Sequence, residues 1–442
     1  MKRLYEDLAY GNGPIKSCFW KTSGPQTQFA PLSQNIRCDI AIIGAGFTGI
    51  SAAYHLAQKG VGSVLLDAEQ PLFGATGRNG GFCCVGGGLI TDRHLDRHSG
   101  KQERLIYRQS ERAAVNLVSN LISDLEIDLD THSKGETKLA HRAKDTFILR
   151  QEIDSIKENY GVSATYHPKE ELTQLGLGGA FHGGLTIPIR FGLNPRKYAA
   201  GLLTNAINGG TKVYGNTAVE KISKSNSGFN LRIQNAEISA DRIILATNGY
   251  SSEDIPNWMR ARFMPVQSSI IVTRPLGDQD LINQGWTSNQ MAFDTRQLLH
   301  YFRLLPDKRF LFGMRGGLFS TPKEDRNIAQ LIRRNFNEMF AAWKDVTIDY
   351  EWSGLACLNR SRLPFVGSIP MMKGAFAGFA YHGNGIAMGT YSGALLCELA
   401  MGQKPSGQYS SALHQVPQRF PFGRYRRQVL RPIYQWNAWQ DR

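Results

Sequence analysis

The sequence of 442 residues is informative first in what it lacks. It has no run of about eighteen apolar residues, which a transmembrane helix would need. Its first seven residues, Met1 to Asp7, contain no apolar segment of the kind that signal peptides carry. It also has no internal repeat and no low-complexity segment. These absences predict a folded cytoplasmic protein that is at most peripheral to the inner face of a membrane.

Cysteine is scarce and shows no metal-ligand spacing. The six cysteines are Cys18, Cys38, Cys83, Cys84, Cys357 and Cys397. The adjacent pair, Cys83 and Cys84, could form a disulfide only with strain. The sequence therefore predicts no metal site, and it predicts free thiols in a reducing compartment.

Acidic residues are too few to balance the basic ones, which leaves a net charge of +14. This excess suggests an anionic partner, substrate or surface, and the plainer alternatives are a generally basic proteome or a solvated basic face. The charge is densest at 419–442, where arginines alternate with aromatic residues. Such a segment suits a membrane interface, but Pro421 and Pro432 interrupt a long helix, so packing against the body of the protein is an equal alternative.

One glycine motif predicts a dinucleotide site. An apolar strand runs into Gly44-Ala-Gly-Phe-Thr-Gly49, and a helix and a second strand ending at Asp67 follow. Gly44 permits a tight turn, Gly46 lets the backbone approach a pyrophosphate, and Gly49 lets helix and strand pack closely. The helix N-terminus offers N–H groups to the phosphates. Asp67 lies eighteen residues after Gly49, where an acid is expected to meet a ribose hydroxyl.

The fold class predicted is α/β, or α+β overall, with a discontinuous Rossmann-like domain and a second mixed-sheet substrate domain. Strand and glycine features return at 241–249 and 374–386, so the nucleotide domain is expected to be built from separate pieces. We expect a leader at 1–37, a nucleotide-binding domain at 38–92, 192–250 and 352–418, a substrate domain at 93–191 and 251–351, and a basic aromatic tail at 419–442. Helical periodicity predicts helices over 101–129 and from Thr321 onward.

Two further glycine-rich motifs indicate which kind of nucleotide-binding protein this is. They are Gly74-Ala-Thr-Gly-Arg-Asn-Gly-Gly81 and Tyr381-His-Gly-Asn-Gly-Ile-Ala-Met-Gly389. With the segments 301–313 and 354–367, they resemble the FAD-dependent amine and D-amino acid oxidase superfamily, most closely its gamma-glutamylputrescine oxidase-like branch. The resemblance extends from about residue 38 to the tail, and it implies that the nucleotide is FAD.

The resemblance implies that the flavin lies between two glycine-rich turns. Backbone groups of 78–81 would reach the N5 side of the ring. A helix beginning at 383–385 would direct its N–H groups toward the charge that builds on the reduced ring. The implied FAD-binding residues are Gly44, Gly46, Phe47, Thr48, Gly49, Asp67, Ala68, Thr76, Arg78, Asn79, Gly80, Gly81, Val219, Ala246, Thr247, Gly249, Gly383, Asn384, Gly385 and Ile386.

Substrate-site residues are predicted less sharply. His382 either contacts the flavin ring or braces its turn, and Tyr301 and Arg303 complete the candidate catalytic set. Further candidates in the second domain are His300, Arg315 and Trp286, and for each of these taken singly a structural role is the first expectation. We expect the FAD to be non-covalent, because the position that matches the linking cysteine of the sarcosine oxidase branch falls near Gly354 and not at Cys357.

The implied reaction is the oxidation of an amine carbon. Hydride passes to flavin N5, water hydrolyses the imine, and the electrons go on to oxygen, which gives peroxide, or to a quinone-type acceptor. This chemistry needs neither a catalytic triad nor a metal.

The sequence departs from the family at three informative positions. Substrate-binding arginines of the D-amino acid and glycine oxidases match Ala356 and Gly383 here, so an amine whose carboxylate is remote or absent is expected to fit best. The oxygen-activating lysine of sarcosine oxidase matches Leu311, with Lys308 and Arg309 nearby. This difference favours a dehydrogenase with a membrane acceptor as an alternative to an oxidase.

The predicted function is oxidation of a gamma-glutamylputrescine-like amine with peroxide formation. The main alternative is a membrane-associated dehydrogenase for a cyclic or secondary amino acid such as L-pipecolate, with membrane contact through 419–442. An RNA-modifying flavoprotein is disfavoured because the chain has no recognisable RNA-binding module, so no nucleic-acid partner is expected. An NAD-dependent dehydrogenase would leave the motifs at 78–81 and 381–389 without a role.

Overall fold

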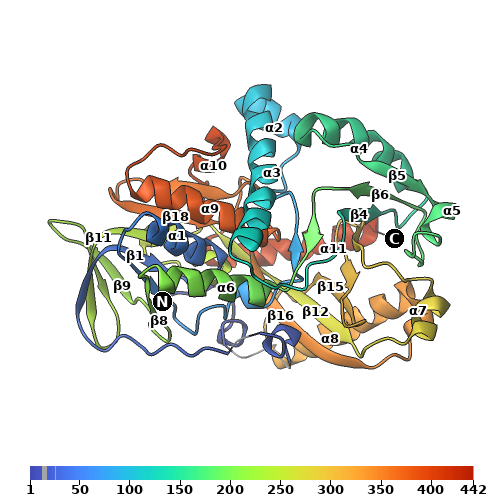
Figure 1. Cartoon of the computed structure of the whole chain (residues 1–442), viewed down its shortest axis with the longest axis horizontal. Coiled ribbons are helices and arrows are strands. Elements are labelled where there is room, and N and C mark those ends of the chain that lie inside the picture. Colours follow the sequence, from blue (N-terminus) through green and yellow to red (C-terminus); the bar gives the residue numbers. More distant parts are fainter. Residues whose placement is uncertain (12–16, 25, 442) are drawn as a thin grey trace.

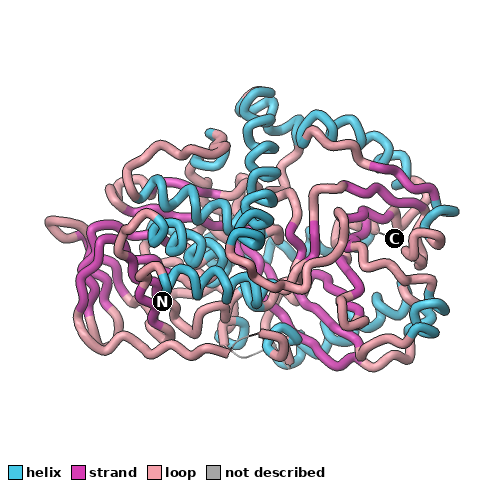
Figure 2. The backbone as a smooth tube through the Cα atoms, viewed as in Figure 1, coloured by secondary structure: helices cyan, strands magenta, loops and turns pink. Residues whose placement is uncertain are grey.

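The computed structural model describes residues 1–11, 17–24 and 26–441 (Figure 1). Two eight-stranded sheets form the two halves of the molecule, and a short pair of strands, β3 (Phe82–Cys83) and β7 (Phe191–Gly192), forms a third sheet. In Figure 2 the strands gather toward the two ends of the long axis, with helices packed around each set.

The first sheet has the order β17-β18-β11-β1-β2-β8, and β9 and β10 extend it as a hairpin beside β11. Strands β1, β2, β8, β11 and β18 run parallel, as a nucleotide-binding fold requires. The bounds are β1 Ile36–Ile43, β2 Ser63–Leu66, β8 Lys212–Tyr214, β9 Lys221–Lys224, β10 Phe229–Arg232, β11 Glu237–Leu245, β17 Phe365–Ser368 and β18 Ala375–Phe379.

Three helices cover one face of this sheet: α1 (Phe47–Gln58), α6 (Pro195–Asn208) and α9 (Gly385–Ala400). Helices α1 and α9 are joined by polar contacts as well as by packing. Thr48 Oγ1 lies 2.8 Å from the Tyr381 hydroxyl, just before α9, and Ser51 Oγ donates to the Thr390 carbonyl at 2.6 Å. The helices therefore hold two turns that are more than three hundred residues apart in a fixed relation.

The second sheet has the order β16-β12-β15-β14-β13-β4-β6-β5. One face packs on α8 (Pro322–Met339) through an aromatic cluster that includes Trp286, Phe302, Phe310 and Trp343. The bounds are β4 Glu136–Leu139, β5 Thr165–Pro168, β6 Gly183–Ile187, β12 Met264–Thr273, β13 Met291–Asp294, β14 Tyr301–Leu304, β15 Phe310–Arg315 and β16 Ile348–Leu358.

The two predicted helices form at the predicted starts. Thr321 Oγ1 accepts the Glu324 N–H at 3.2 Å, and Pro322 begins α8. Helix α3 begins at Lys101 but ends at Asp124, short of residue 129, because Glu126 takes a left-handed conformation with φ 50°. The remaining helices are α2 Asp92–Ser99, α4 Asp145–Tyr160, α5 Lys169–Leu172, α7 Asp278–Gln284, α10 Ser411–His414 and α11 Leu430–Gln440.

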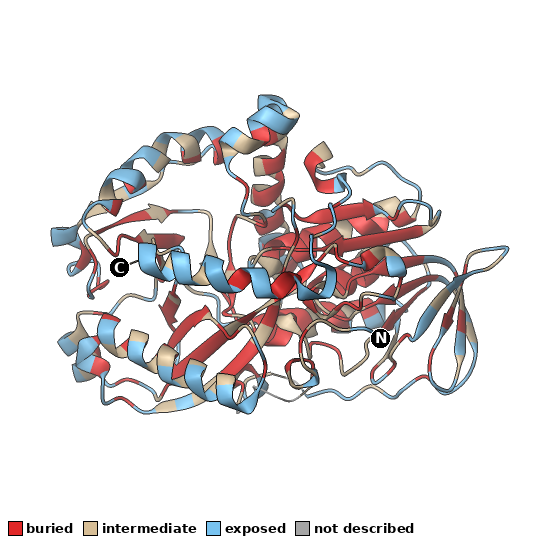
Figure 3. Cartoon of the chain, turned by 180° about the vertical axis from the view of Figure 1, so that it is seen from behind, coloured by how far each residue is buried: buried red, intermediate tan, exposed pale blue. Residues whose placement is uncertain are grey.

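The C-terminal segment both packs on the protein and presents an exposed face. The 3-10 turn Gly423–Val429 buries Arg426 and Arg427, and α11 then crosses the side of the molecule seen in Figure 3, with much of its surface exposed. Trp436 and Trp439 remain 58% and 62% exposed. Arg442 of the predicted tail lies outside the described residues.

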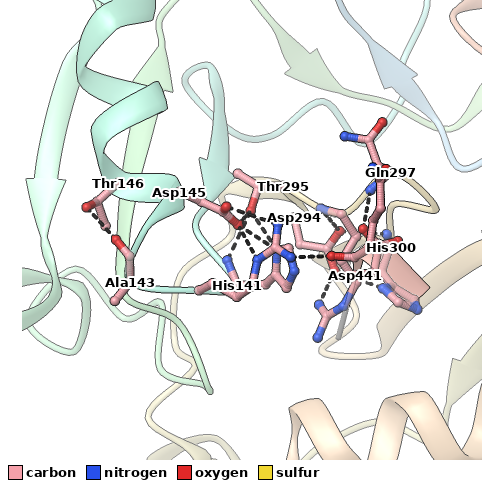
Figure 4. A network of polar contacts seen from close by, with 12 residues as sticks. His141, Ala143, Asp145, Thr146, Asp294, Thr295, Gln297, His300 and Asp441 are labelled. Carbon is pink, nitrogen blue, oxygen red and sulfur yellow. Dashed lines mark hydrogen bonds and ion pairs between the residues drawn. The ribbon is translucent and has the colours of Figure 1, made fainter. Parts of the chain in front are cut away.

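The end of α11 is fixed to a loop of the second sheet (Figure 4). The Asp441 carboxylate accepts the N–H groups of Gln297 and Leu298 at 2.8 and 3.0 Å. In the same loop, Asp294 accepts from His300 at 2.8 Å. These bonds connect α11 to the turn between β13 and β14.

In the part of the chain that the structure describes, we find no helix with the length and apolar character to cross a bilayer. The same residues contain no cluster of His, Cys, Asp and Glu that could hold a metal ion. All six cysteines are described, and each is a free thiol, as the sequence predicts.

Candidate active site

A cavity of about 540 Å³ lies between the two sheets and receives residues from both. On one side it is lined by the residues that directly follow three parallel strands: Gly44 after β1, Asp67 after β2 and Ala246 after β11. The carboxyl edge of a parallel sheet is where this fold class binds its ligands. On the other side the cavity is lined by residues of β12, β13, β14, β16 and β4.

The turn after β1 admits only glycine at two positions. Gly44 has φ +106°, and a Cβ there would lie 2.7 Å from the Ala246 carbonyl oxygen. A Cβ on Gly49 would lie 1.9 Å from the Gly44 carbonyl oxygen. Gly44 is also one of the residues that line the cavity, whereas Gly49 lies beneath the turn and keeps α1 close to it.

Asp67 is held at the end of β2 by backbone donors. Its carboxylate accepts the N–H groups of Ala45 at 2.8 Å and Glu69 at 3.0 Å, and the side chain faces the cavity. Burial raises the pKa of Asp67 to about 6, although both backbone donors act to lower it. The carboxyl group thus sits where the sequence motif places a ribose-binding acid.

Arg78 gives the cavity a buried guanidinium. The residue is 4% exposed, it packs 4.2 Å from the ring centre of Phe73, and neither Nη1 nor Nη2 has a hydrogen-bond partner. A buried cation without a partner is costly, so this group fits a ligand that supplies acceptor atoms. The following turn is rigid because Asn79 accepts the Gly81 N–H at 2.8 Å and donates to the carbonyls of Ala75 and Thr76.

Helix α9 begins at the cavity. Gly383, Asn384, Gly385 and Ile386 all line it, so the N-terminal end of a sixteen-residue helix faces the space between the sheets. This end carries free N–H groups and partial positive charge. The adjacent His382 also lines the cavity, and burial lowers its pKa to about 4. The imidazole is therefore neutral near neutral pH.

Tyr301 lies on the wall formed by the second sheet. Its hydroxyl is 2.9 Å from Ser268 Oγ, and its ring meets Phe82 edge to face at 5.5 Å. Burial raises the pKa of Tyr301 to about 12, so the phenol keeps its proton. Tyr301 is the predicted catalytic residue, besides His382, that the structure brings to the cavity.

The structure brings most of the predicted cofactor residues into this one cavity. The residues that line it are Gly44, Gly46, Phe47, Thr48, Asp67, Ala68, Thr76, Arg78, Asn79, Gly80, Val219, Ala246, Thr247, Gly383, Asn384, Gly385 and Ile386. Three predicted glycines, Gly49, Gly81 and Gly249, are not among its lining residues. Gly249 instead packs against β16, where a Cβ would meet the Leu355 carbonyl at 3.0 Å.

Arg303 does not line the cavity either. It is fully buried behind the wall, where Nη2 donates to the Leu193 carbonyl at 2.8 Å and Nη1 lies 3.2 Å from His132 Nε2. Burial lowers the pKa of Arg303 to about 9. The structure therefore places this residue as a support for Phe82, whose ring lies 5.5 Å from the guanidinium, and not in the lining of the cavity.

The other substrate-domain candidates also lie away from the cavity. Trp286 is in the aromatic cluster, and His300 is bonded to Asp294 and Asn335. The Arg315 guanidinium stacks on the ring of Tyr434 in α11 at 3.6 Å. These three side chains have structural partners, which is the plainer of the two interpretations that the sequence allowed.

The cavity wall also contains a charged pair that no sequence pattern predicts. Glu136 begins β4, Arg190 precedes β7, both line the cavity, and Arg190 Nη1 donates to Glu136 Oε2. Their side chains are 5% and 11% exposed. Neither residue belongs to a recognisable motif, and Glu136 lies in a segment whose only sequence signal is strand propensity. The pair could not have been found without the sheet pairing that sets β4 beside β6, where Glu136 lies opposite Ile187, three residues before Arg190.

The positions at which the sequence departs from the family have clear places. Ala356 and Gly383, which match the substrate-binding arginines of the D-amino acid and glycine oxidases, both line the cavity. Leu311 is buried in the sheet, and Lys308 pairs with Asp278 at the surface at 2.7 Å. Among the described residues, the lining of the cavity includes no lysine.

Comparison with known proteins identifies the class to which this cavity belongs. Residues 39–399 match the model of the DAO family, described as FAD dependent oxidoreductase, and the chain belongs to this family. The glycine turn, the carboxyl group of Asp67, the unpaired Arg78 guanidinium and the α9 terminus fit the cofactor of that family. The family match decides against the NAD-dependent alternative.

Two named relatives are similar to this chain over most of its length. The chain is 29% identical over 427 residues to a Rhizobium meliloti protein named "Probable oxidoreductase OrdL", covering 96% of this chain and 97% of the relative. It is 27% identical over 401 residues to the gamma-glutamylputrescine oxidoreductase of Escherichia coli, covering 90% of this chain and 91% of the relative.

Solved structures share the fold. Glycine oxidase from Geobacillus kaustophilus superposes with a TM-score of 0.70 at 18% identity, covering 87% of this chain and 99% of the other. L-proline dehydrogenase from P. horikoshii superposes with a TM-score of 0.69 at 16% identity, covering 84% and 95%. The protein is therefore a FAD-dependent oxidoreductase of the DAO family, and it shares its fold with enzymes named for amino-acid substrates.

Proposed function

We propose that FAD occupies the cavity with its ADP half at the Gly44 turn and Asp67, and with its flavin between the Arg78 turn and the N-terminus of α9. Val219, which lines the cavity beside the first sheet, would lie near the adenine. The first sheet would form the FAD-binding domain, and the second sheet would form the substrate domain. The attachment is proposed to be non-covalent, because the position that matches the linking cysteine of the sarcosine oxidase branch falls near Gly354 and not at Cys357.

When bound, FAD supplies the acceptor for a hydride from the amine carbon. The chain supplies the setting for that transfer. The N-terminus of α9 favours negative charge on its side of the cavity. The neutral His382 and the protonated Tyr301 neither add a positive charge near the amine nor take up its proton near neutral pH. The amine must therefore arrive unprotonated or lose its proton to water.

The substrate we propose is an amine that carries its carboxylate far from the reacting carbon, such as gamma-glutamylputrescine, with oxygen as acceptor and peroxide as product. The observation that carries this proposal is the wall at Ala356 and Gly383, which offers no guanidinium to an α-carboxylate beside the reacting carbon. The similarity to the gamma-glutamylputrescine oxidoreductase of Escherichia coli supports the same substrate class.

A substrate panel tests this proposal. The purified holoenzyme is supplied with gamma-glutamylputrescine, putrescine, glycine, D-alanine and L-pipecolate in air, and both peroxide and the carbonyl product are measured. We expect turnover with gamma-glutamylputrescine, one peroxide for each aldehyde, and little turnover with the simple α-amino acids. Efficient turnover of glycine or D-alanine would contradict the proposal, because the cavity would then bind an α-carboxylate without the missing arginines.

A second candidate is a membrane-associated dehydrogenase for a cyclic or secondary amino acid such as L-pipecolate. The face of α11 favours it, because Ile433, Trp436 and Trp439 are exposed. Arg424, before α11, and Arg431, within α11, are exposed as well. Aromatic rings beside arginines suit the headgroup region of an anionic bilayer. The cavity lining also offers, among the described residues, no lysine to promote a reaction with oxygen.

Two measurements distinguish this candidate from an oxidase. The first compares turnover with a soluble quinone and with oxygen, and the second measures cosedimentation with vesicles that contain anionic lipid. A dehydrogenase would prefer the quinone and would bind the vesicles, less so after W436S/W439S substitution. Full-rate peroxide formation together with indifference to vesicles would exclude it.

A further inference from the structure

The Glu136–Arg190 pair is the charged feature of the cavity that the chemistry of hydride transfer does not use. Both side chains face the cavity, and they lie on the wall of the second sheet, away from the proposed adenine end. Arg190 Nη1 donates to Glu136, whereas Arg190 Nε is buried and has no hydrogen-bond partner. The pair thus brings one negative and one incompletely bonded positive group to the same space.

Stability alone does not explain a buried ion pair in the wall of a cavity. Burying two opposite charges gains little stability by itself, because the loss of hydration offsets their attraction. Arg104 forms a comparable buried cluster with Asp96 and Glu158, but that cluster joins α2, α3 and α4 and does not line the cavity. The Glu136–Arg190 pair differs because a ligand in the cavity can reach both charges.

Sheet pairing sets the distance between this pair and the proposed reaction site. Tyr301 pairs with Phe293 on β13, and Glu136 pairs with Met291 on the other side of β13. Glu136 and Tyr301 are therefore two strands apart and offset by two residues, which is about 12 Å. The same register turns Glu136, Phe293 and Tyr301 to one face of the sheet, and all three line the cavity.

The wall between the two ends is apolar. Phe293 and Leu299 line the cavity along with Glu136 and Tyr301. An extended chain spans about 12 Å in about ten bonds. A ligand that reaches from the amine site to the charged pair is therefore a chain of about that length, with an apolar or amide-containing middle and a charged far end.

We propose that Glu136 and Arg190 bind the α-ammonium and the α-carboxylate of a remote amino-acid head, while the reacting amine lies at the Tyr301 end of the cavity. This inference rests on the proposed function and makes its substrate class specific: an amine joined by a linker to a zwitterionic head. A gamma-glutamyl amine has about ten bonds between its reacting carbon and its head charges. Each partner of the ion pair then exchanges one protein contact for a ligand contact, so no charge is left unpaired.

The first test uses the unaltered holoenzyme and three amines of equal length. They are gamma-glutamylputrescine, its analogue without the α-amino group (glutarylputrescine), and its analogue without the α-carboxylate (4-aminobutanoylputrescine). We expect kcat/KM to fall about 10- to 100-fold for each truncated head, as for the loss of a hydrogen bond to a charged group. Equal kcat/KM for all three amines would overturn the inference while leaving amine oxidation intact.

The second test assigns each head group to its partner by a readout other than turnover. Calorimetry measures binding of gamma-glutamylbutylamine, which has the head but no amine to oxidise, to wild type, E136Q, R190Q and E136Q/R190Q. We expect about 10- to 100-fold weaker binding in each single variant. E136Q should no longer distinguish ligands with and without the α-amino group, and R190Q should no longer distinguish those with and without the α-carboxylate. If a single variant folds poorly, the double variant is measured in its place. It should distinguish neither ligands with and without the α-amino group nor ligands with and without the α-carboxylate.

E152Q is the matched control. Glu152 does not line the cavity, and it forms an ion pair at 2.7 Å with Lys138, which lies on β4 as Glu136 does. E152Q should bind the head analogue as wild type does. Unchanged binding in the E136Q, R190Q and double variants would overturn the inference. If the head analogue binds through both residues but no amine in the panel reduces the flavin, the binding site stands and the proposed reaction fails.

Discussion

Arg78 provides the sharpest prediction, because one substitution should change the apoprotein and the holoprotein in opposite directions. Arg78 is 4% exposed, its Nη1 and Nη2 atoms have no hydrogen-bond partner, and the guanidinium lies 4.2 Å from the ring centre of Phe73 and 6.0 Å from that of Tyr250. In Arg78→Met the flexible apolar side chain fills similar space without the buried charge. The apoprotein should therefore become more stable, while FAD should bind more weakly.

The magnitudes follow from this geometry. Leaving a buried charge without its partner typically costs about 3–5 kcal/mol, and a desolvated cation–π contact returns about 2 kcal/mol. The net gain for the apoprotein of Arg78→Met is then about 1–3 kcal/mol. In the holoprotein, a hydrogen bond to a charged group contributes about 1.5–3 kcal/mol. Losing it should weaken FAD binding by about 10- to 150-fold.

The assay combines chemical denaturation of the apoprotein with a fluorescence titration of FAD. Arg426→Met is the matched control: Arg426 is 2% exposed, but it donates to Phe263, Gly423 and Glu253 at 2.6–3.0 Å. That variant should lose stability because it leaves these acceptors unpaired, and FAD affinity should not change. If Arg78→Met destabilises the apoprotein as Arg426→Met does and leaves FAD affinity unchanged, the reasoning about Arg78 is refuted.

Three further predictions concern the cavity and α11. Gly49→Ala should yield protein that purifies without FAD, because the new Cβ would lie 1.9 Å from the Gly44 carbonyl; normal flavin content would contradict this. FAD affinity should fall as pH drops through about 6, because burial raises the pKa of Asp67 and its carboxylate is then protonated, while the apoprotein gains stability from this group over the same range. Asp67→Asn should abolish both trends. Asp441→Asn should loosen α11, because it weakens acceptance from Gln297 and Leu298 at 2.8 and 3.0 Å, and faster amide exchange at those two residues would show it.

Local sequence patterns predicted the parts of the site that local chemistry determines. Gly44 and Gly49 must be glycine because of backbone contacts within one turn and the strand beside it, and that requirement appears as a spacing. Thr321 and Pro322 similarly predict the start of α8. The family match confirms the resemblance that the motifs at 74–81 and 381–389 indicated.

Long-range packing determines the parts that the sequence did not predict. Glu136 and Arg190 meet because β4, β6 and β13 pair in a particular register, and no spacing along the chain encodes this meeting. Arg303 was predicted to belong to the catalytic set, but the strands around it bury it behind Phe82. The tail packs on the protein through Arg426, which is one of the two predicted alternatives, and membrane contact through the exposed Trp436 stays a prediction.

The most direct test of the central claim is anaerobic titration of the holoenzyme with gamma-glutamylputrescine, followed by the absorbance of the oxidised flavin. Without oxygen, each oxidised amine must leave its two electrons on the bound FAD. We predict complete bleaching by one equivalent of gamma-glutamylputrescine and recovery of the yellow colour when acceptor is admitted. A flavin that stays oxidised with this amine but is bleached by glycine or D-alanine would contradict the account.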